Sequence, residues 1–248
     1  MNNSSFDYVA PNSNKINTVD NFHSICVDDF FSNPDKIRNW GLSLEKQPDP
    51  DGRWPGVRSK PLHEVNPQFS NELILKVMCS YIDLKYHNIS WGESVVCFQE
   101  ITPFKNEIEN IGWIHRDGGM QLAFIIYLTP NADVNSGTSL YNLKNTNSII
   151  PKQYQKEKLF KGEKIDDEEY KTAVLENQNL FYEKNRFQNI YNRMIAYDAS
   201  EFHRANNFTT NTDKRLTLVG FVTKIQIEEM PLEKIRNYGE VEKSINVI

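Results

Sequence analysis

The chain has 248 residues, a formal net charge of −5 and a pI of about 5.6. This length suits one large domain, since β-sandwich and barrel domains run to roughly 200–250 residues. The acidic balance gives no electrostatic reason to expect nucleic-acid binding, which needs a basic face. The three cysteines, Cys26, Cys79 and Cys97, lack metal-ligand spacing, so we expect free thiols in a reducing compartment.

The sequence also carries no sign of export or of a membrane anchor. Residues 1–5 lack the basic start and apolar stretch of a secretory signal. No uncharged apolar run approaches the roughly 18 residues that a membrane span needs. We therefore expect a soluble, cytoplasmic protein without a membrane partner. Nothing in the residues indicates an oligomeric state.

The first third of the chain predicts helices that support a sheet. Residues 1–17 are polar and predict a surface arm, and residues 21–31 predict a short strand. A cap-like residue and Pro34 then begin a helix, and Asn66 with Pro67 begins a second one. Between them, residues 47–61 are rich in Pro, Gly and Asp and predict a loop.

From Ser94 the pattern becomes β-rich. Apolar, β-branched runs predict strands at residues 95–101, 121–128, 138–143, 192–197 and 215–222. The charged stretch 145–184, with helical spacing over 166–183, predicts an insertion that caps one end of the sheet structure. The tail 228–248 is polar and weakly helical. We expect one domain over 1–248, with helical support in 1–93 and the β core in 94–227.

The residues that indicate chemistry are His115, Asp117, His203 and Arg215. His115 and Asp117 point to the same side of an extended segment, because side chains alternate there. This pair lies between a β-rich segment and a strongly apolar strand, so its side chains would lie at a sheet mouth. Two histidines and one carboxylate are the ligand set of non-haem iron(II) centres with open positions. A planar guanidinium, as in Arg215, matches the two oxygens of a carboxylate.

These motifs resemble the iron(II)- and 2-oxoglutarate-dependent dioxygenases, closest in pattern to the prolyl-4-hydroxylase-like branch. The resemblance covers about residues 95–223 without the charged insertion. The matching motifs, in chain order, are His115-Arg116-Asp117, Tyr127-Leu128, Ser136-Gly137-Thr138, Phe202-His203-Arg204 and Arg215-Leu216-Thr217. The resemblance implies a double-stranded β-helix, the jelly roll also found in cupins, with flanking helices.

The pattern departs from the family in places that leave the metal ligands intact. Ser136-Gly137 replaces the usual Gly-Gly turn, and Phe221 lies where some hydroxylases carry Trp. The insertion before Asn185 is longer than in minimal members, and the N-terminal helices match only loosely. These differences leave the substrate unassigned.

By this resemblance, His115, Asp117 and His203 ligate the metal and act as the catalytic centre. Arg215 binds the distal carboxylate of 2-oxoglutarate, and Tyr127 and Thr217 add hydroxyl contacts to it. These residues also have purely structural alternatives. They are a surface hydrogen bond between His115 and Asp117, a turn histidine at His203, a solvated edge-strand arginine at Arg215 and a core tyrosine at Tyr127. A charge inside an apolar strand needs a partner, which favours the co-substrate for Arg215.

Other polar residues are weaker candidates. Gln99, Trp113, Gln121 and Arg204 are candidates for lining the pocket. The three remaining histidines lack the same context and are interpreted as structural or exposed: His23, His63 and His87.

The leading hypothesis is an Fe(II)- and 2-oxoglutarate-dependent hydroxylase that uses O2, with ascorbate as an optional reductant. Its substrate would be a peptide or protein side chain or a small amino-acid-like molecule, with succinate and CO2 as further products. Two alternatives stay open. One is a non-catalytic jelly-roll binding or structural protein, and the other is a cupin-like isomerase or hydrolase with another divalent metal.

Overall fold

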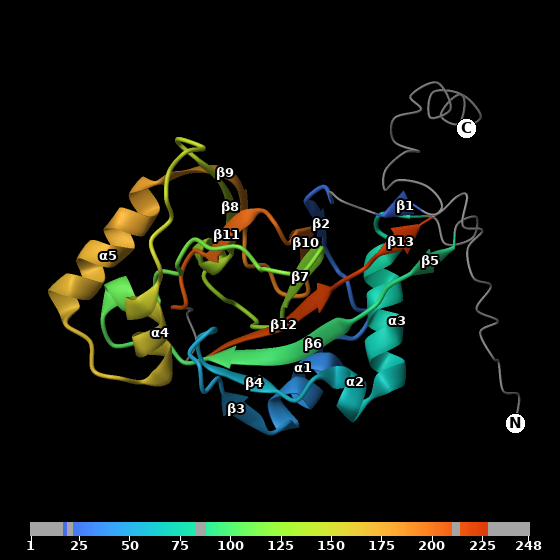
Figure 1. The fold of residues 1–248 in the computed structure, drawn as a ribbon. Helices are drawn as coiled ribbons and strands as arrows, with labels where there is room; N and C mark the ends of the chain where they lie inside the picture. The colour runs from blue at the N-terminus through green and yellow to red at the C-terminus, as the bar shows by residue number, and fades with distance from the viewer. Residues whose placement is uncertain (1–16, 19–21, 83–87, 210–213, 228–248) are drawn as a thin grey trace, which may run out of the picture.

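The computed structural model describes residues 17–18, 22–82, 88–209 and 214–227 (Figure 1). The surface arm predicted at the N-terminus, the weakly helical tail predicted over 228–248 and His87 lie outside these residues. The prediction of one domain over 1–248 stays a prediction.

The described part of the chain is built around a seven-stranded antiparallel sheet (Figure 1). Its spatial order is β2 (Ile25–Val27), β10 (Met194–Asp198), β7 (Leu122–Tyr127), β12 (Arg215–Val222), β6 (Ser94–Ile101), β4 (Val57–Ser59) and β3 (Lys46–Pro48). All four central strands, β10, β7, β12 and β6, were predicted from their apolar, β-branched runs. Each is largely buried, because helices cover one face and a second sheet covers the other.

The second sheet is smaller and completes a jelly roll. It has the order β11 (Phe202–Ala205), β8 (Thr138–Leu143) and β9 (Phe181–Phe187), and an antiparallel bridge between His115 and His203 adds the 113–115 segment beside β11. The eight segments from β6 to β12 are thus distributed over two facing sheets, with β12 paired between β6 and β7. This order is the double-stranded β-helix that the sequence led us to expect.

Helices on the outer face of the large sheet supply the support predicted for residues 1–93. They are α1 (Pro34–Ser43), α2 (Leu62–Val65) and α3 (Pro67–Met78). The side chain of Asn33 accepts a hydrogen bond from the Lys36 amide, and that of Asn66 accepts one from the Phe69 amide. Each asparagine is followed by proline at the first helical position, so both predicted helix starts are confirmed.

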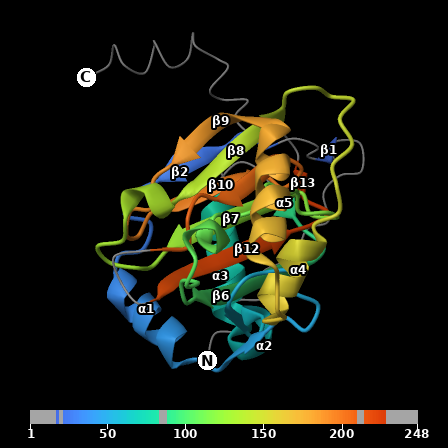
Figure 2. The same ribbon diagram turned by 90° about the vertical axis from the view of Figure 1, so that its left-hand side faces the viewer.

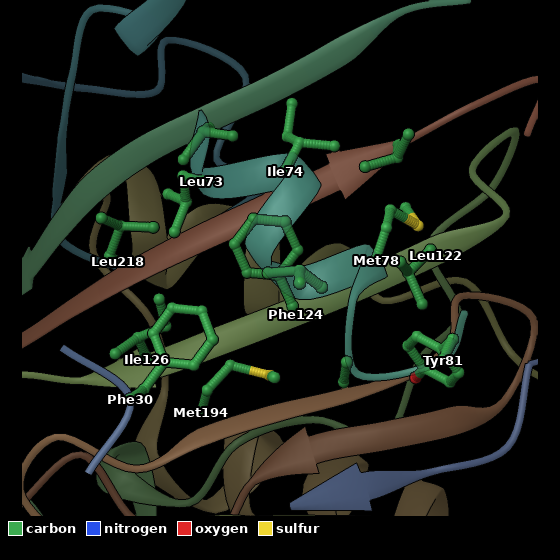
Figure 3. Close-up of a cluster of buried hydrophobic side chains, with 14 of the residues drawn as sticks. Phe30, Leu73, Ile74, Met78, Tyr81, Leu122, Phe124, Ile126, Met194 and Leu218 are labelled. Carbon is green, nitrogen blue, oxygen red and sulfur yellow. The ribbon is translucent and has the colours of Figure 1, made fainter. Parts of the chain in front are cut away.

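The main hydrophobic core lies between α3 and the large sheet (Figure 3). Leu73, Ile74 and Met78 of α3 pack toward Phe124 and Leu218 of the sheet, and all five are at most 3% exposed. Tyr81, predicted on the same helix face, lies just beyond the end of α3 and donates its hydroxyl proton to the His23 carbonyl. The core therefore joins α3 to one face of the large sheet and leaves the opposite face for the site.

The insertion forms two helices, α4 (Tyr154–Lys161) and α5 (Asp167–Asn179). Figure 2 shows them in front of the strands, away from α1 and α3. The boundary predicted at 184 is wrong, because β9 begins at Phe181 and is part of the small sheet. Charged and polar residues predominate in β9, because most of its side chains are exposed. The sequence therefore lacks the apolar alternation that predicts a strand.

Two further predictions are corrected. The predicted loop 47–61 contains β4 and part of β3, a short hairpin at the edge of the large sheet. The alternative interpretation of His203 as a turn histidine is wrong, because His203 lies inside β11. β4 and β11 are too short for a clear periodic pattern. Pairing of β4 with β6 and of β11 with β8 defines them as strands.

The remaining described elements are small. A three-stranded sheet has the order β1 (Asn17–Thr18), β13 (Gln226–Ile227) and β5 (Ile89–Ser90). The 3-10 helices are η1 (Glu107–Asn110) and η2 (Val134–Ser136). In the described part of the chain, no helix has the length and apolar character needed to cross a membrane.

Candidate metal centre

Backbone pairing brings the two predicted histidine ligands together. The amide of His115 donates to the carbonyl of His203 at 3.0 Å, and the amide of His203 donates back at 2.9 Å. Directly paired residues in antiparallel strands point their side chains to the same side. The two imidazole rings accordingly lie 4.4 Å apart, centroid to centroid.

The third predicted ligand joins them. The amide of Asp117 donates to the carbonyl of Ala199, which fixes the end of the 113–117 segment. Oδ2 of Asp117 lies 3.2 Å from Nε2 of His203, and Oδ1 lies 3.8 Å from Nε2 of His115. One ligand atom from each of the three residues lies within 4.8 Å of the others, as a shared metal ion requires. No other cluster of this kind occurs among the residues that the structure describes.

The tautomers of both histidines suit metal binding. Nδ1 of His115 lies 2.8 Å from the Trp113 carbonyl, and Nδ1 of His203 lies 3.0 Å from the Glu201 carbonyl. A carbonyl only accepts, so each Nδ1 carries the proton and each Nε2 of the neutral ring presents a lone pair. In the neutral state, both Nε2 atoms therefore face a carboxylate with no proton between them, an arrangement that a cation relieves.

The charges at the cluster follow from burial and proximity. Burial disfavours the imidazolium of His203, but the Asp117 carboxylate outweighs this effect and raises the pKa of His203. Burial would raise the pKa of Asp117, but His203, His115 and Arg58 together lower it to about 2. Burial and the charge of His203 lower the pKa of His115. Asp117 is thus an anion at neutral pH, and a divalent metal would take the place of the proton on His203.

Arg215 lies in the middle of the large sheet, which removes the alternative of a solvated edge-strand arginine. It begins β12, between β6 and β7, and is 3% exposed. Its Nε and Nη2 atoms are buried and have no hydrogen-bond partner. No ion pair involves it among the described residues. The guanidinium instead lies 5.8 Å from the ring centroid of Tyr127.

Thr217 and Tyr127 lie beside Arg215 on the same face of the sheet. Thr217 follows Arg215 by two residues and pairs directly with Tyr127. Its buried hydroxyl has no partner, whereas the hydroxyl of Tyr127 donates to Oγ1 of Thr138 at 2.9 Å. The face thus presents unpaired hydrogen-bonding atoms on Arg215 and Thr217.

The weaker candidates separate into different places. Gln99 is buried on the same face, paired with Thr217, and donates to the Pro55 carbonyl. Trp113 donates to the Tyr170 hydroxyl in the insertion, and Gln121 accepts from the Ile225 amide at the sheet end. Arg204 follows His203 on β11 and therefore points away from the cluster, over the ring of Tyr141. His23 and His63 are exposed, as expected.

The structure adds three residues that the sequence analysis missed. The ring of Tyr197 lies 4.9 Å from that of His203. Burial and the charge of Asp117 raise the pKa of its hydroxyl, and the charge of Arg215 opposes this rise. Arg58 lies in the predicted loop, and Lys156 lies in the charged insertion. A single charged residue in a loop or a helix gives no sequence signal of what its side chain faces, so the sequence did not single out Arg58 or Lys156.

Comparisons with solved structures return proteins of the family that the motifs resemble. HygX from Streptomyces hygroscopicus, with nickel and 2-oxoglutarate bound, is 12% identical with a TM-score of 0.47, covering 81% of this chain and 82% of its own. A 2OG-Fe(II) oxygenase family oxidoreductase from Burkholderia pseudomallei is 9% identical (TM-score 0.44; 81% and 85% covered). A prolyl-4-hydroxylase from Pseudomonas putida is 8% identical (TM-score 0.41; 81% and 92% covered).

Sequence comparison gives a narrower result. No curated protein matches the chain. A family model described as "Family of unknown function (DUF6445)" matches residues 11–221, which include the cluster and Arg215. The chain therefore belongs to the DUF6445 family.

Proposed function

We propose that this protein is an iron(II)- and 2-oxoglutarate-dependent dioxygenase that hydroxylates a C–H bond. The observation that carries the proposal is Arg215, a buried cation in a central strand with two unpartnered nitrogen atoms. Burying a charge without a partner is costly, so the site is built for an anion that the protein itself does not supply. The His–Asp–His cluster shares the space between the two sheets with it.

The chemistry of the cluster fits iron(II). His115, Asp117 and His203 would hold the ion through two Nε2 atoms and one carboxylate oxygen. Two imidazoles and one carboxylate leave positions open for a co-substrate, which a closed structural zinc site lacks. The backbone carbonyls that receive both Nδ1 protons keep the rings oriented before any ion binds.

The face around Arg215 fits one end of a dicarboxylate. Arg215 would form two parallel hydrogen bonds with a carboxylate, and the unpartnered hydroxyl of Thr217 would donate a third. Tyr127 would border the same carboxylate with its ring and hydroxyl. The ring of Tyr197 lies 4.9 Å from that of His203, so Tyr197 would border the co-substrate at its metal-bound end.

When bound, iron(II) and 2-oxoglutarate supply the oxidising power, with O2 consumed and succinate and CO2 formed beside the hydroxylated product. The protein residues have the other tasks. Arg215 and Thr217 fix the orientation of the co-substrate, and the apolar inner-face residues exclude water. The segment 113–117 and β11 hold the ligands rigidly, because their backbones are hydrogen-bonded to each other.

The substrate that we propose is a peptide or protein side chain or a small amino-acid-like molecule. The cluster lies beside the 113–115 edge of the small sheet, and the insertion covers this edge through Asn177 and Gln153. A cupin-like hydrolase would have no use for a buried unpaired arginine. A non-catalytic jelly-roll protein would bind iron and 2-oxoglutarate no better than its site variants.

The test is anaerobic addition of iron(II) and 2-oxoglutarate to the purified protein. We expect a visible charge-transfer band from the chelated co-substrate in the wild type. Asp117→Ala, which removes one metal ligand, should lose the band while the protein keeps its fold by circular dichroism. A folded wild type without the band, and without succinate formation from any candidate substrate in air, would refute the proposal.

A further inference from the structure

A second arginine lies on the face of the large sheet that carries Arg215. Arg58 of β4 pairs with Gln99 of β6, and Gln99 pairs with Thr217 of β12. Directly paired residues of antiparallel strands point their side chains to the same side, so Arg58 shares the inner face with Thr217 and Arg215. The two arginines therefore stand on one face, on strands that β6 separates.

The side chain of Arg58 reaches toward the end of this face where the metal cluster lies. Its guanidinium carbon is 5.8 Å from the ring centroid of Phe221 on β12. Phe221 pairs with Ala123 of β7, and Ala123 pairs with Tyr197 of β10, so the three side chains form one row across the sheet. The ring of Tyr197 lies 4.9 Å from that of His203. Arg58 thus contacts a row of side chains that ends beside a metal ligand.

Arg58 also forms a pair of hydrogen-bond donors with Trp54, which lies in the loop between β3 and β4. The guanidinium carbon is 4.3 Å from the Trp54 ring centroid, within cation–π distance. Nε of Arg58 and Nε1 of Trp54 are both buried nitrogen atoms without a hydrogen-bond partner. Each residue as a whole is only half-buried, so the pair lies close to the protein surface. Two unused N–H donors and one positive charge therefore stand together.

Gln99 holds this pair in place without using those two donors. Its Oε1 accepts a hydrogen bond from Nη2 of Arg58 at 3.2 Å. Its Nε2 donates to the carbonyl of Pro55, the residue after Trp54, at 2.8 Å. One buried side chain thus fixes both the arginine and the loop that carries the indole ring, and leaves Nε of Arg58 and Nε1 of Trp54 without an acceptor.

The missing acceptor is an anion. Among the residues that the structure describes, no carboxylate is in ion-pair contact with Arg58. Burial lowers the pKa of Arg58 only to about 10, so the guanidinium is charged at neutral pH. A partly desolvated charge and two unused buried donors are costly unless an acceptor satisfies them, and a negatively charged oxygen satisfies both.

We propose that Arg58 and Trp54 bind a carboxylate of the substrate, which makes this a hydroxylase of acidic substrates. The inference rests on the proposed function and names the substrate class for that site. The Nε–H of Arg58 and the indole N–H of Trp54 would both donate to the carboxylate, while Arg215 binds the co-substrate elsewhere on the same face. The carboxylate belongs either to a small free acid or to an acidic side chain in a peptide.

The test compares acids with their amides on the anaerobic protein loaded with iron(II) and 2-oxoglutarate, and the shift of the charge-transfer band measures binding. The probes are the common free amino acids against their α-carboxamides, and capped Ala-Asp-Ala and Ala-Glu-Ala against their asparagine and glutamine counterparts. We expect at least one acid to bind about tenfold or more tightly than its amide, because the amide lacks the charge that Arg58 balances. Whether free acids or peptides show this preference identifies the source of the carboxylate.

Variants separate the donor pair from the rest of the site. Arg58→Gln should lose most of the preference for acid over amide and still form the band. Trp54→Phe keeps an aromatic ring under the guanidinium but removes the indole N–H, and should reduce the preference about threefold. Arg53→Gln removes an exposed arginine from the same loop and should keep the preference. So should Trp91→Phe, because Trp91 packs against the main core.

Three outcomes would overturn the inference while the band persists and the proposed function stands. They are acids that bind no better than their amides, including no binding of any acid, an unchanged preference in Arg58→Gln, and an unchanged preference in Trp54→Phe. If Arg58→Gln weakens 2-oxoglutarate instead, Arg58 belongs to the co-substrate and the inference is wrong. A missing band in the wild type would count against the proposed function itself.

Discussion

Arg215 and Lys156 are both buried cations without an ion-pair partner in the described part of the chain, but they differ in how they respond to burial. The guanidinium of Arg215 stays charged at any ordinary pH, although burial lowers its pKa. The ammonium of Lys156 has a pKa of about 8, so its charge is lost within an accessible pH range. Arg215 can therefore bind an anion at any ordinary pH, whereas the charge of Lys156 is lost when the pH rises above about 8.

Replacing Arg215 with lysine tests geometry apart from charge. Arg215→Lys keeps a cation but cannot form two parallel hydrogen bonds with a carboxylate. We expect 2-oxoglutarate to bind about tenfold to a hundredfold more weakly, as about 1.5–3 kcal/mol of charge-assisted hydrogen bonding is lost. Titration of the anaerobic charge-transfer band measures this affinity. An unchanged midpoint would show that Arg215 is not the anchor.

Replacing Lys156 with methionine tests the cost of its burial. The lowered pKa means that the folded protein disfavours the charged lysine, so Lys156→Met should raise the stability at pH 7 by on the order of 1–3 kcal/mol. Between pH 8 and 10.5 the unfolded chain holds the proton and the folded one does not, so the wild type gains stability as pH rises and the difference shrinks. Urea unfolding at pH 7 and pH 10 measures it. A destabilised variant at pH 7 would contradict this account.

At the scale of elements, the insertion takes the place of a missing strand. The 113–115 segment is an edge, paired only with β11 among the described strands. Oδ1 of Asn177 on α5 accepts from the Ile114 amide at 2.9 Å, and Nδ2 donates to the Ile114 carbonyl at 3.1 Å. A side-chain amide thus satisfies both peptide groups as a neighbouring strand would. Trp113 adds a hydrogen bond to Tyr170 of the same helix.

This arrangement predicts that α5 supports the metal centre from outside. Asn177→Ala leaves the buried Ile114 amide without an acceptor, at a cost of about 1–3 kcal/mol, and loosens the backbone next to His115. We expect lower stability together with weaker iron(II) binding. Asn179→Ala, an exposed position on the same helix, should change neither. Thermal unfolding measures the stability, and calorimetric titration measures the iron(II) affinity. If Asn177→Ala kept the wild-type iron(II) affinity, α5 would not support the metal centre.

At the scale of the whole molecule, the large sheet divides the protein into a supporting side and a functional side. Phe124 points toward α3 and lies in the main core, whereas Tyr127 on the same strand points between the sheets. Gly220 pairs with Phe124 across β12 and β7, and a Cβ atom there would lie 2.0 Å from the phenyl ring. The glycine leaves the space that this ring occupies.

Filling that space should destabilise the fold without touching the site. Gly220→Ala forces the Phe124 ring to move in a packed core, for which we expect a loss of about 1–3 kcal/mol. Gly118→Ala is the matched control, because a Cβ atom there meets nothing within 4 Å. Chemical denaturation of both variants measures the loss. Equal stability of the two would show that the core can accommodate the methyl group.

Prediction from the sequence succeeded where one signal was strong and local. The strands β6, β7, β8, β10 and β12 were found from apolar runs, and the starts of α1 and α3 from an asparagine followed by proline. The strands β3, β4 and β9 were missed, because pairing with neighbours and not their own pattern makes them strands. Arg58 and Lys156 were missed for a different reason, because a single charged residue in a loop or helix carries no local sign of what it faces.

The sequence by itself determined the residue types of the cluster, the order of the main strands and the need of Arg215 for a partner, because alternation and burial of charge are local rules. Only the tertiary structure decided that His115 and His203 pair across strands and that Asp117 reaches both. Those contacts join residues far apart in the chain, and strand register and helix docking, which fix them, depend on the packing of the whole core.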